Sequence, residues 1–140
     1  MQEKRIIGRV EMVDLPELGL YHVPAKVDTG AETSVLHCDH YEIFAKDGRR
    51  YIRCSIDGLP DFTFLIHRER VIKSSFGQAE TRHIFVTKIK LFNTLFDIKL
   101  SVRDRSNMSY PMLLGRNFIS GKFLVDVSLD HFVKNRNTRS

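Results

Sequence analysis

The segment AKVDTGAETSVLHCDH, residues 25–40, places one acidic residue at the end of an apolar run and follows it with Thr-Gly. An aspartate in such a position often marks a turn, because its side chain accepts hydrogen bonds from nearby backbone N–H groups. A turn accounts less well for a strand-like run that ends in Asp28-Thr29-Gly30-Ala31. The alternative is that a strand delivers the Asp28 carboxylate to a site, and the rest of the chain decides between the two.

The chain has 140 residues, of which 42% are apolar and 28% charged, as expected for one soluble globular domain. Its first residues do not resemble a signal peptide, and no apolar run approaches the roughly 18 residues of a membrane span. Cys38 and Cys54 are too few for a disulfide framework and suit a reducing compartment. We therefore expect a cytoplasmic protein without a membrane partner.

The net charge of +5 is concentrated at the C-terminal end, where Lys134, Arg136 and Arg139 occur without an acid. This distribution predicts a single domain over residues 1–133 and a basic disordered tail over residues 134–140. The sequence contains no RNA-binding signature, Cys/His finger or helix-turn-helix pattern. We expect no nucleic-acid partner.

Strand-like patterns dominate the chain. Phe62, Phe64 and Ile66 alternate with polar residues, as do the apolar residues from 96 to 102. Short helices are expected at 32–40 and 116–120, with turns at Asp47-Gly48, at Asp57-Gly58 and at residues 92–94. The expected strands cover residues 6–10, 22–27, 51–56, 61–66, 83–90, 95–102, 112–114 and 123–127. Many short strands without βαβ spacing predict a closed or sandwich-like all-β domain.

A single ionised aspartate is a weak base. Two aspartates that share one proton can act as acid and base together, because two charges so close cannot both ionise. The chain has one Asp-Thr-Gly, so such a pair would require a second copy of the chain.

The segment Val27–Ala31, followed much later by Met112–Asn117, resembles the pattern of retroviral-type aspartic proteases. The resemblance is stronger to a bacterial and archaeal branch labelled "ATP-dependent zinc protease" and associated with RimK-type glutamate ligases. It spans roughly residues 8 to 128, in blocks at residues 15–19, 26–37, 70–77, 103–108, 111–117 and 123–126.

This resemblance implies a small closed retropepsin-like barrel with one short C-terminal helix. It implies a catalytic Asp28 whose loop is shaped by Thr29 and Gly30, and a supporting group made of Ala31, Glu32, Gly115, Arg116 and Asn117. Glu32 is a departure, since most of the branch carries a basic residue there. Glu32 either pairs with Arg116, as its viral counterpart does, or is an exposed glutamate favoured by a helix start.

The polar segment at residues 67–83 is either a plain hairpin loop or, by resemblance, the flap that closes over a substrate. Its candidate flap and substrate residues are Arg70, Ser74, Ser75 and Gly77. Six Lys/Arg and two acids lie between His67 and Lys90. This excess of positive charge either attracts acidic substrates or is simply solvated.

The family label predicts zinc and ATP, but the sequence supports neither. It contains no His-Glu-x-x-His and no phosphate-binding Gly-x-x-x-x-Gly-Lys-Ser/Thr loop. The cluster His37-Cys38-x-His40 has no partner pair at matching spacing, so background histidines are the better interpretation. We expect no metal and no cofactor, and we interpret the two cysteines as buried spectators.

The resulting hypothesis is a homodimeric aspartic peptidase that activates water through Asp28 and acts on a peptide or protein, with glutamate-extended tails as candidate substrates. The strand at 123–127 and Ile6-Ile7 are the candidates for pairing between chains. A catalytically inactive peptide-binding adaptor and a metallopeptidase are the alternatives.

Overall fold

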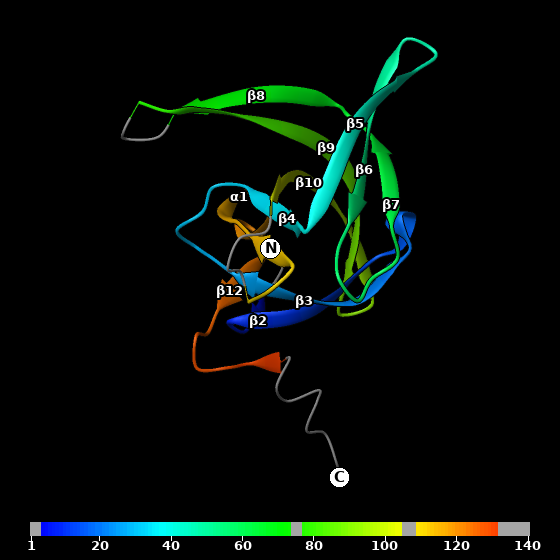
Figure 1. Cartoon of the computed structure of the whole chain (residues 1–140). Coiled ribbons are helices and arrows are strands. Elements are labelled where there is room, and N and C mark those ends of the chain that lie inside the picture. Colours follow the sequence, from blue (N-terminus) through cyan, green and yellow to red (C-terminus); the bar gives the residue numbers. More distant parts are fainter. Residues whose placement is uncertain (1–3, 74–76, 105–108, 132–140) are drawn as a thin grey trace.

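The computed structural model describes residues 4–73, 77–104 and 109–131, and strands form most of them (Figure 1). The tail predicted over residues 134–140 lies outside these ranges. The strands are β1 (Arg5–Ile7), β2 (Val10–Leu15), β3 (Leu20–Val27), β4 (Ser34–Cys38), β5 (His40–Lys46), β6 (Arg49–Ser55), β7 (Phe62–Leu65), β8 (Arg68–Lys73), β9 (Ala79–Leu91), β10 (Thr94–Asp104), β11 (Met112–Leu114) and β12 (Phe123–Val125). A 3₁₀ turn, η1 (Pro16–Leu18), and a short helix, α1 (Arg116–Ile119), complete the described elements.

Six strands close into a barrel. They follow the order β10-β4-β11-β3-β2-β9, and β9 pairs again with β10 to close the ring. Strand β8 adds to the outside of β9. The predicted closed all-β barrel with one short helix near the C-terminus is therefore confirmed. No helix of the described residues is long and apolar enough to span a membrane.

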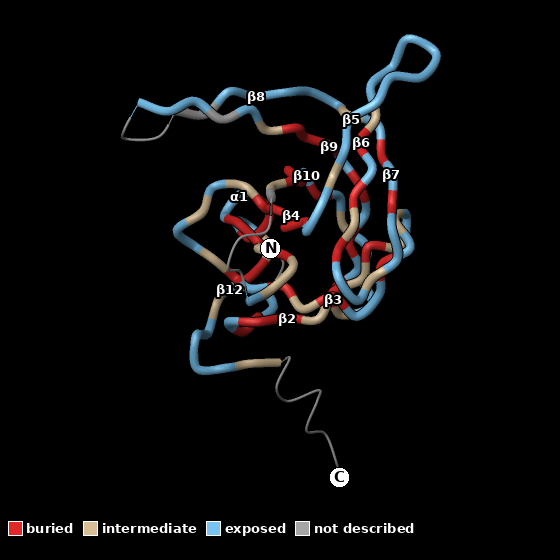
Figure 2. The backbone as a smooth tube through the Cα atoms, viewed as in Figure 1, coloured by how far each residue is buried: buried red, intermediate tan, exposed pale blue. Residues whose placement is uncertain are grey.

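The barrel core follows from alternation along the strands. Ile98, Leu100 and Val102 of β10 are buried, whereas Asp97 and Lys99, which precede Ile98 and Leu100, are exposed. Because successive side chains of a strand point to opposite faces, one face fills the barrel and the other remains outside. Figure 2 shows these buried stretches lining the interior.

A second sheet, β5-β6-β7, packs against the barrel. It contributes Ile52, Cys54 and Phe64 to the same buried cluster. Cys54 hydrogen-bonds to Cys38, and this contact together with burial raises the pKa of the Cys54 thiol. Both cysteines are free and buried, as the sequence predicts.

The helix predicted at residues 32–40 is wrong. Strand β4 occupies this position, and all five of its residues are buried. It pairs in parallel with β10 and antiparallel with β11, so both of its edges are bonded. Two long-range ladders thus override a local pattern that resembles a short helix.

The segment at residues 67–83, interpreted above as either a plain hairpin loop or a flap, belongs to a long two-stranded hairpin. Strands β8 and β9 pair from Arg68↔Ile84 to Lys73↔Ala79. The hairpin projects from the body as an arm (Figure 1). Gly77 lies beyond the last of these pairs with φ +82°, whereas Ser74 and Ser75 lie outside the described residues.

The two strands proposed for pairing between chains pair with each other within this chain. Strand β1 runs parallel to β12, with Ile6 opposite Leu124. Strand β12 ends at Val125, two residues before the predicted end of the strand. One edge of each strand is thus occupied.

Gly115 ends β11 at the point where the chain approaches the loop after β3. A methyl group at this position would lie 2.5 Å from the Thr33 carbonyl oxygen and 2.6 Å from the carbonyl carbon. The Gly115 φ of −96° is open to any residue, so the requirement for glycine is steric. Glycine thus allows the β11–α1 junction to lie against residues 32 and 33.

The N-terminal and C-terminal segments meet at a buried carboxylate. Glu11 is 2% exposed, and its Oε2 accepts a hydrogen bond from the Gly8 N–H at 2.6 Å. The same oxygen contacts His131 Nδ1, near the end of the described chain. Leu129 continues this attachment by accepting a hydrogen bond from the Arg9 N–H at 2.8 Å.

We predict that Gly115→Ala lowers the free energy of unfolding by about 1–3 kcal/mol, because the added methyl overpacks a backbone contact. Chemical denaturation monitored by circular dichroism measures the change. Gly121→Asn is the control: Gly121 has φ +81° with nothing near its would-be side chain, and asparagine tolerates that conformation. Equal stabilities of Gly115→Ala and wild type would contradict the close approach.

We predict that Glu11→Ala costs about 1–3 kcal/mol, because it leaves the buried Gly8 N–H without its acceptor. Glu42→Ala is the matched control, since Glu42 pairs with Arg53 at the surface, where an ion pair contributes about 0–1 kcal/mol. Denaturation of both variants under the same conditions checks the difference. Similar losses for the two variants would argue against a structural role for Glu11.

Candidate active site

Asp28 is the first residue after β3. Its N–H donates to the Leu114 carbonyl at 2.9 Å, which extends the pairing of β3 with β11 by one residue. Its Oδ1 accepts a hydrogen bond from the Gly30 N–H at 3.0 Å, and its carbonyl accepts one from Ala31 at 3.1 Å. The side chain therefore braces its own turn. Asp28 is half-buried, so part of the residue remains accessible.

The C-terminal turn supports this loop through three hydrogen bonds. The N–H groups of Arg116 and Asn117 donate to the carbonyls of Ala31 and Glu32 at 2.8 and 2.9 Å. The Arg116 guanidinium donates to the Thr29 carbonyl at 3.1 Å. The structure thus brings together the two motifs that the sequence separates by more than 80 residues.

Ser34 anchors the same junction from inside. Its hydroxyl accepts a hydrogen bond from the Gly115 N–H at 2.9 Å, and the residue is buried. The sequence analysis did not assign a role to Ser34. Its position one residue after Thr33 in a segment matching the family pattern was the available signal.

The expected pair between Glu32 and Arg116 is wrong for the described chain. Arg116 binds the Thr29 carbonyl, and Glu32 Oε1 lies 3.6 Å from Arg70 Nη1 on β8. No helix begins at Glu32, so the alternative of a helix-start glutamate is also wrong. Both side chains of the Glu32–Arg70 pair are about half exposed, so the pair contributes little to stability. It links the Asp28 loop to the base of the flap-like hairpin.

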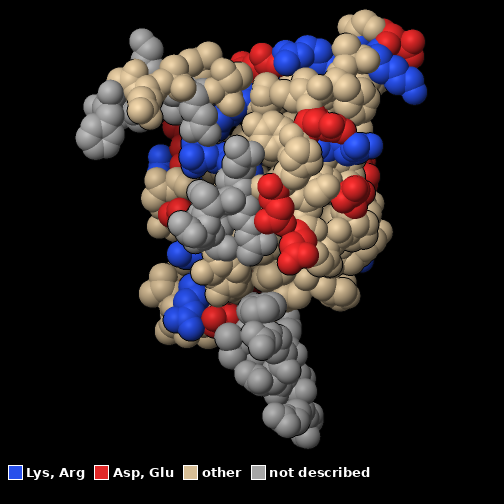
Figure 3. Space-filling model, viewed as in Figure 1, with Lys and Arg blue, Asp and Glu red and all other residues tan. Residues whose placement is uncertain are grey.

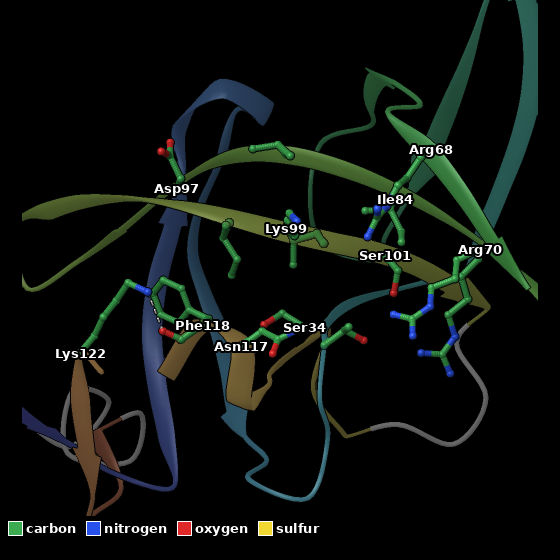
Figure 4. Close-up of a pocket in the computed structure, with 15 residues that line it drawn as sticks. Ser34, Arg68, Arg70, Ile84, Asp97, Lys99, Ser101, Asn117, Phe118 and Lys122 are labelled. Carbon is green, nitrogen blue, oxygen red and sulfur yellow. Dashed lines mark hydrogen bonds between the residues drawn. The ribbon is translucent and has the colours of Figure 1, made fainter. Parts of the chain in front are cut away.

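A pocket of about 400 Å³ lies between the base of this hairpin and α1 (Figure 4). Its walls come from Thr33 and Ser34, from β8, β9 and β10, and from α1. Its positively charged residues are Arg68, Arg70, Arg82, Lys99 and Lys122, and its acidic residue is Asp97. Lys and Arg side chains are visible beneath the hairpin in Figure 3. The charge of residues 67–90 was predicted from the sequence, whereas Lys99 and Lys122 lie outside that range and were missed.

The described residues contain no group of three or more His, Cys, Asp or Glu side chains placed to hold a metal ion. His37 lies buried in β4, whereas His40 is exposed at the start of β5. The expectation that the protein needs no metal or cofactor stays a prediction.

The curated proteins that are similar to this chain are longer than the chain itself. A probable alpha-L-glutamate ligase of Desulfotalea psychrophila is 34% identical over 133 residues, which cover 90% of this chain and 29% of that protein. A probable alpha-L-glutamate ligase of Parasynechococcus marenigrum is 36% identical over 138 residues, covering 94% and 30%. The chain thus spans less than a third of the length of these relatives.

A crystal structure of a Legionella pneumophila protein of unknown function is similar over 91% of this chain and 96% of that one. Its TM-score is 0.71, with 29% sequence identity. A family model described as RimB-like, "Retropepsin-like aspartic endopeptidase RimB", matches residues 6–137. The chain therefore belongs to the RimB-like family of retropepsin-like aspartic endopeptidases.

Proposed function

We propose that the protein is an aspartic peptidase that works as a homodimer. The observation that carries this proposal is the accessible Asp28 carboxylate, held by the Gly30 N–H in a loop that Arg116 and Asn117 clamp from behind. Such support fixes the position of a carboxylate while leaving an oxygen open to water or substrate. Oδ2 of Asp28 accepts no hydrogen bond from the described residues.

One carboxylate per chain requires a partner for acid-base chemistry. With two copies of the chain related by a two-fold axis, two Asp28 side chains would face each other and share one proton. The ionised carboxylate takes a proton from water as the water attacks the peptide carbonyl. The protonated one donates to the developing oxyanion, and the leaving nitrogen is protonated as the tetrahedral intermediate collapses.

The two-stranded sheet β1–β12 is our candidate surface for dimerisation. Ile6 and Leu124 are register partners, and they are 51% and 55% exposed. Val127, just after β12, is 72% exposed. Large apolar side chains gathered on one exposed sheet are typical of surfaces that another protein covers.

We propose acidic peptides, with glutamate-rich tails foremost, as the substrate. The basic residues beneath the hairpin support this choice, because they attract a negatively charged chain. The curated relatives are named probable alpha-L-glutamate ligases and are more than three times as long as the matched region. Proteins with that name therefore contain a region similar to this chain. We propose that the peptidase acts in the cytoplasm, because its two cysteines are free and suit a reducing compartment.

Asp28→Asn tests the chemistry, since it keeps the shape of the side chain and removes the titrating group. We expect hydrolysis of a glutamate-rich peptide to fall by about 10²–10⁴-fold with the fold intact. Asp47→Asn is the matched control, because Asp47 is exposed at φ +53°, a conformation that asparagine tolerates.

Peptide hydrolysis followed by mass spectrometry, with and without a chelator, provides the measurement. Equal turnover by Asp28→Asn and wild type would refute the aspartic mechanism. Loss of activity with the chelator and recovery with zinc would favour a metallopeptidase. Binding of peptide without cleavage by the wild type would identify an inactive adaptor.

Leu124→Lys tests the dimer, because it places a charge in the proposed apolar interface. We expect wild type to sediment at micromolar concentration as a species of twice the 16.3 kDa chain mass, and the variant as a monomer with little activity. Leu65→Lys is the control, since Leu65 is 43% exposed on β7, in the separate β5-β6-β7 sheet that pairs with neither β1 nor β12. An active protein that stays monomeric at all concentrations would overturn the proposal.

A further inference from the structure

The pocket between the hairpin base and α1 is built on the outer face of three strands. In the strand register, Arg68 lies opposite Ile84, and Ile84 lies opposite Ser101. Lys99 lies opposite Val86 on the same face. The neighbouring residues of β10, Ile98 and Leu100, are buried in the barrel core. The side chains of Lys99 and Ser101 thus project from the face of the sheet opposite to those of Ile98 and Leu100, although these two core residues also border the pocket.

Two arginines of the wall face each other directly. Arg70 on β8 is the register partner of Arg82 on β9, and both line the pocket. Like charges directly opposite each other on an antiparallel pair are destabilising. Glu32 offsets part of this repulsion, because its Oε1 lies 3.6 Å from Arg70 Nη1, and a bound anion would offset more of it. Asp97, the acid among the pocket residues, forms an ion pair with Lys88, and this contact raises the pKa of Lys88. The Asp97 charge is thus paired with Lys88 rather than with the pocket arginines.

A buried hydroxyl adds a second, independent indication of a ligand. Ser101 is 3% exposed and lines the pocket, and its Oγ has no hydrogen-bond partner among the described residues. A buried hydroxyl without a partner is unfavourable in a folded protein. Figure 4 shows this hydroxyl directed toward the space beside Ser34. The Ser34 hydroxyl oxygen accepts a hydrogen bond from the Gly115 N–H. The hydroxyl proton of Ser34 can therefore be donated to a ligand.

The pocket also has apolar walls, formed by Ile84, Val86 and Phe118. A side chain with methylene groups and a terminal carboxylate matches this combination of apolar walls, guanidinium groups and hydroxyl donors. Guanidinium groups bind carboxylates through paired, charge-assisted hydrogen bonds. A volume of about 400 Å³ is ample for one such side chain with its neighbouring backbone.

The pocket borders the segment that follows the Asp28 loop, although Asp28 itself does not line it. Thr33 and Ser34 follow the Asp28 loop directly, and the Asn117 N–H donates to Glu32 at 2.9 Å. A peptide bound along this loop would therefore place one of its side chains near the pocket.

We propose that this pocket is the subsite for an acidic side chain flanking the scissile bond, with Arg68, Arg82 and Ser101 as its specificity-determining residues. The proposal rests on the peptidase function proposed above. It assigns the preference for acidic substrates to one pocket rather than to the general charge of the protein. Arg70 is shared between this subsite and its contact with Glu32.

Binding is measured separately from cleavage by using the full chain with Asp28→Asn. Isothermal titration with a hexaglutamate peptide, a hexaglutamine peptide, glutarate and inorganic phosphate gives the affinities. We expect hexaglutamate to bind more tightly than hexaglutamine, and glutarate to compete with it. Arg82→Gln should weaken hexaglutamate by about 10–100-fold, as removal of a charged hydrogen-bonding group does. Arg53→Gln, exposed on β6 outside the pocket, should change the affinity less than twofold.

Ser101→Ala provides a signature that a structural role would not produce. Removing a buried hydroxyl without a partner should leave the stability of the free protein unchanged or raise it, while hexaglutamate affinity falls several-fold. In the protein with Asp28 intact, Arg82→Gln should raise KM for glutamate-rich peptides, with little change for glutamine-rich ones.

The outcomes separate the two proposals. Selective hexaglutamate binding that depends on Arg82 and Ser101, without cleavage by the wild type, would keep the subsite and reject the peptidase. Cleavage by the wild type with affinities that neither substitution changes would keep the peptidase and reject the subsite. Phosphate binding that glutarate and hexaglutamate fail to displace would assign the pocket to a free inorganic anion and overturn the side-chain assignment.

Discussion

The candidate site depends on one close approach of two backbone segments. Gly115 has no side chain, so the end of β11 lies against the Thr33 carbonyl, at a position where a methyl group would clash. This contact allows the Gly115 N–H to reach Ser34 and the next two N–H groups to reach the Asp28 loop. The loop that holds the carboxylate is therefore fixed by a turn far along the chain. A rigid support of this kind is what a positioned acid-base group requires.

The strands β9 and β10 have two separate roles because their faces differ. The side chains of Ile98 and Leu100 are buried in the barrel core, whereas those of Lys99 and Ser101 project from the opposite face, toward the basic pocket. The same alternation that stabilises the fold therefore also places a row of polar and charged side chains beside the Asp28 loop. The hairpin base contributes its arginines to the same space, so the pocket is enclosed by an arm that projects beyond the barrel.

Local sequence patterns failed where long-range pairing decides the structure. Residues 34–38 resemble the start of a short helix, yet they form a central strand because β10 and β11 bond to both of its edges. The predicted pairing of Glu32 with Arg116 was wrong for a related reason. Arg116 points to the Thr29 carbonyl, and Arg70 from the hairpin takes the place beside Glu32. Neither outcome is visible in neighbouring residues, because both depend on how distant segments meet.

The sequence by itself determined the all-β class, the alternation of most strands and the two motifs around Asp28 and Gly115, because these depend on residue type and on short spacing. The tertiary structure decided the ring order of the strands, including the parallel pairs β3–β11 and β4–β10. It also decided the pocket, whose cations come from three strands and from Lys122, three residues after α1. Register between distant strands is a property of the closed barrel, in which every strand must satisfy two neighbours at once. A local pattern specifies which residues form a strand, but it does not specify the neighbour.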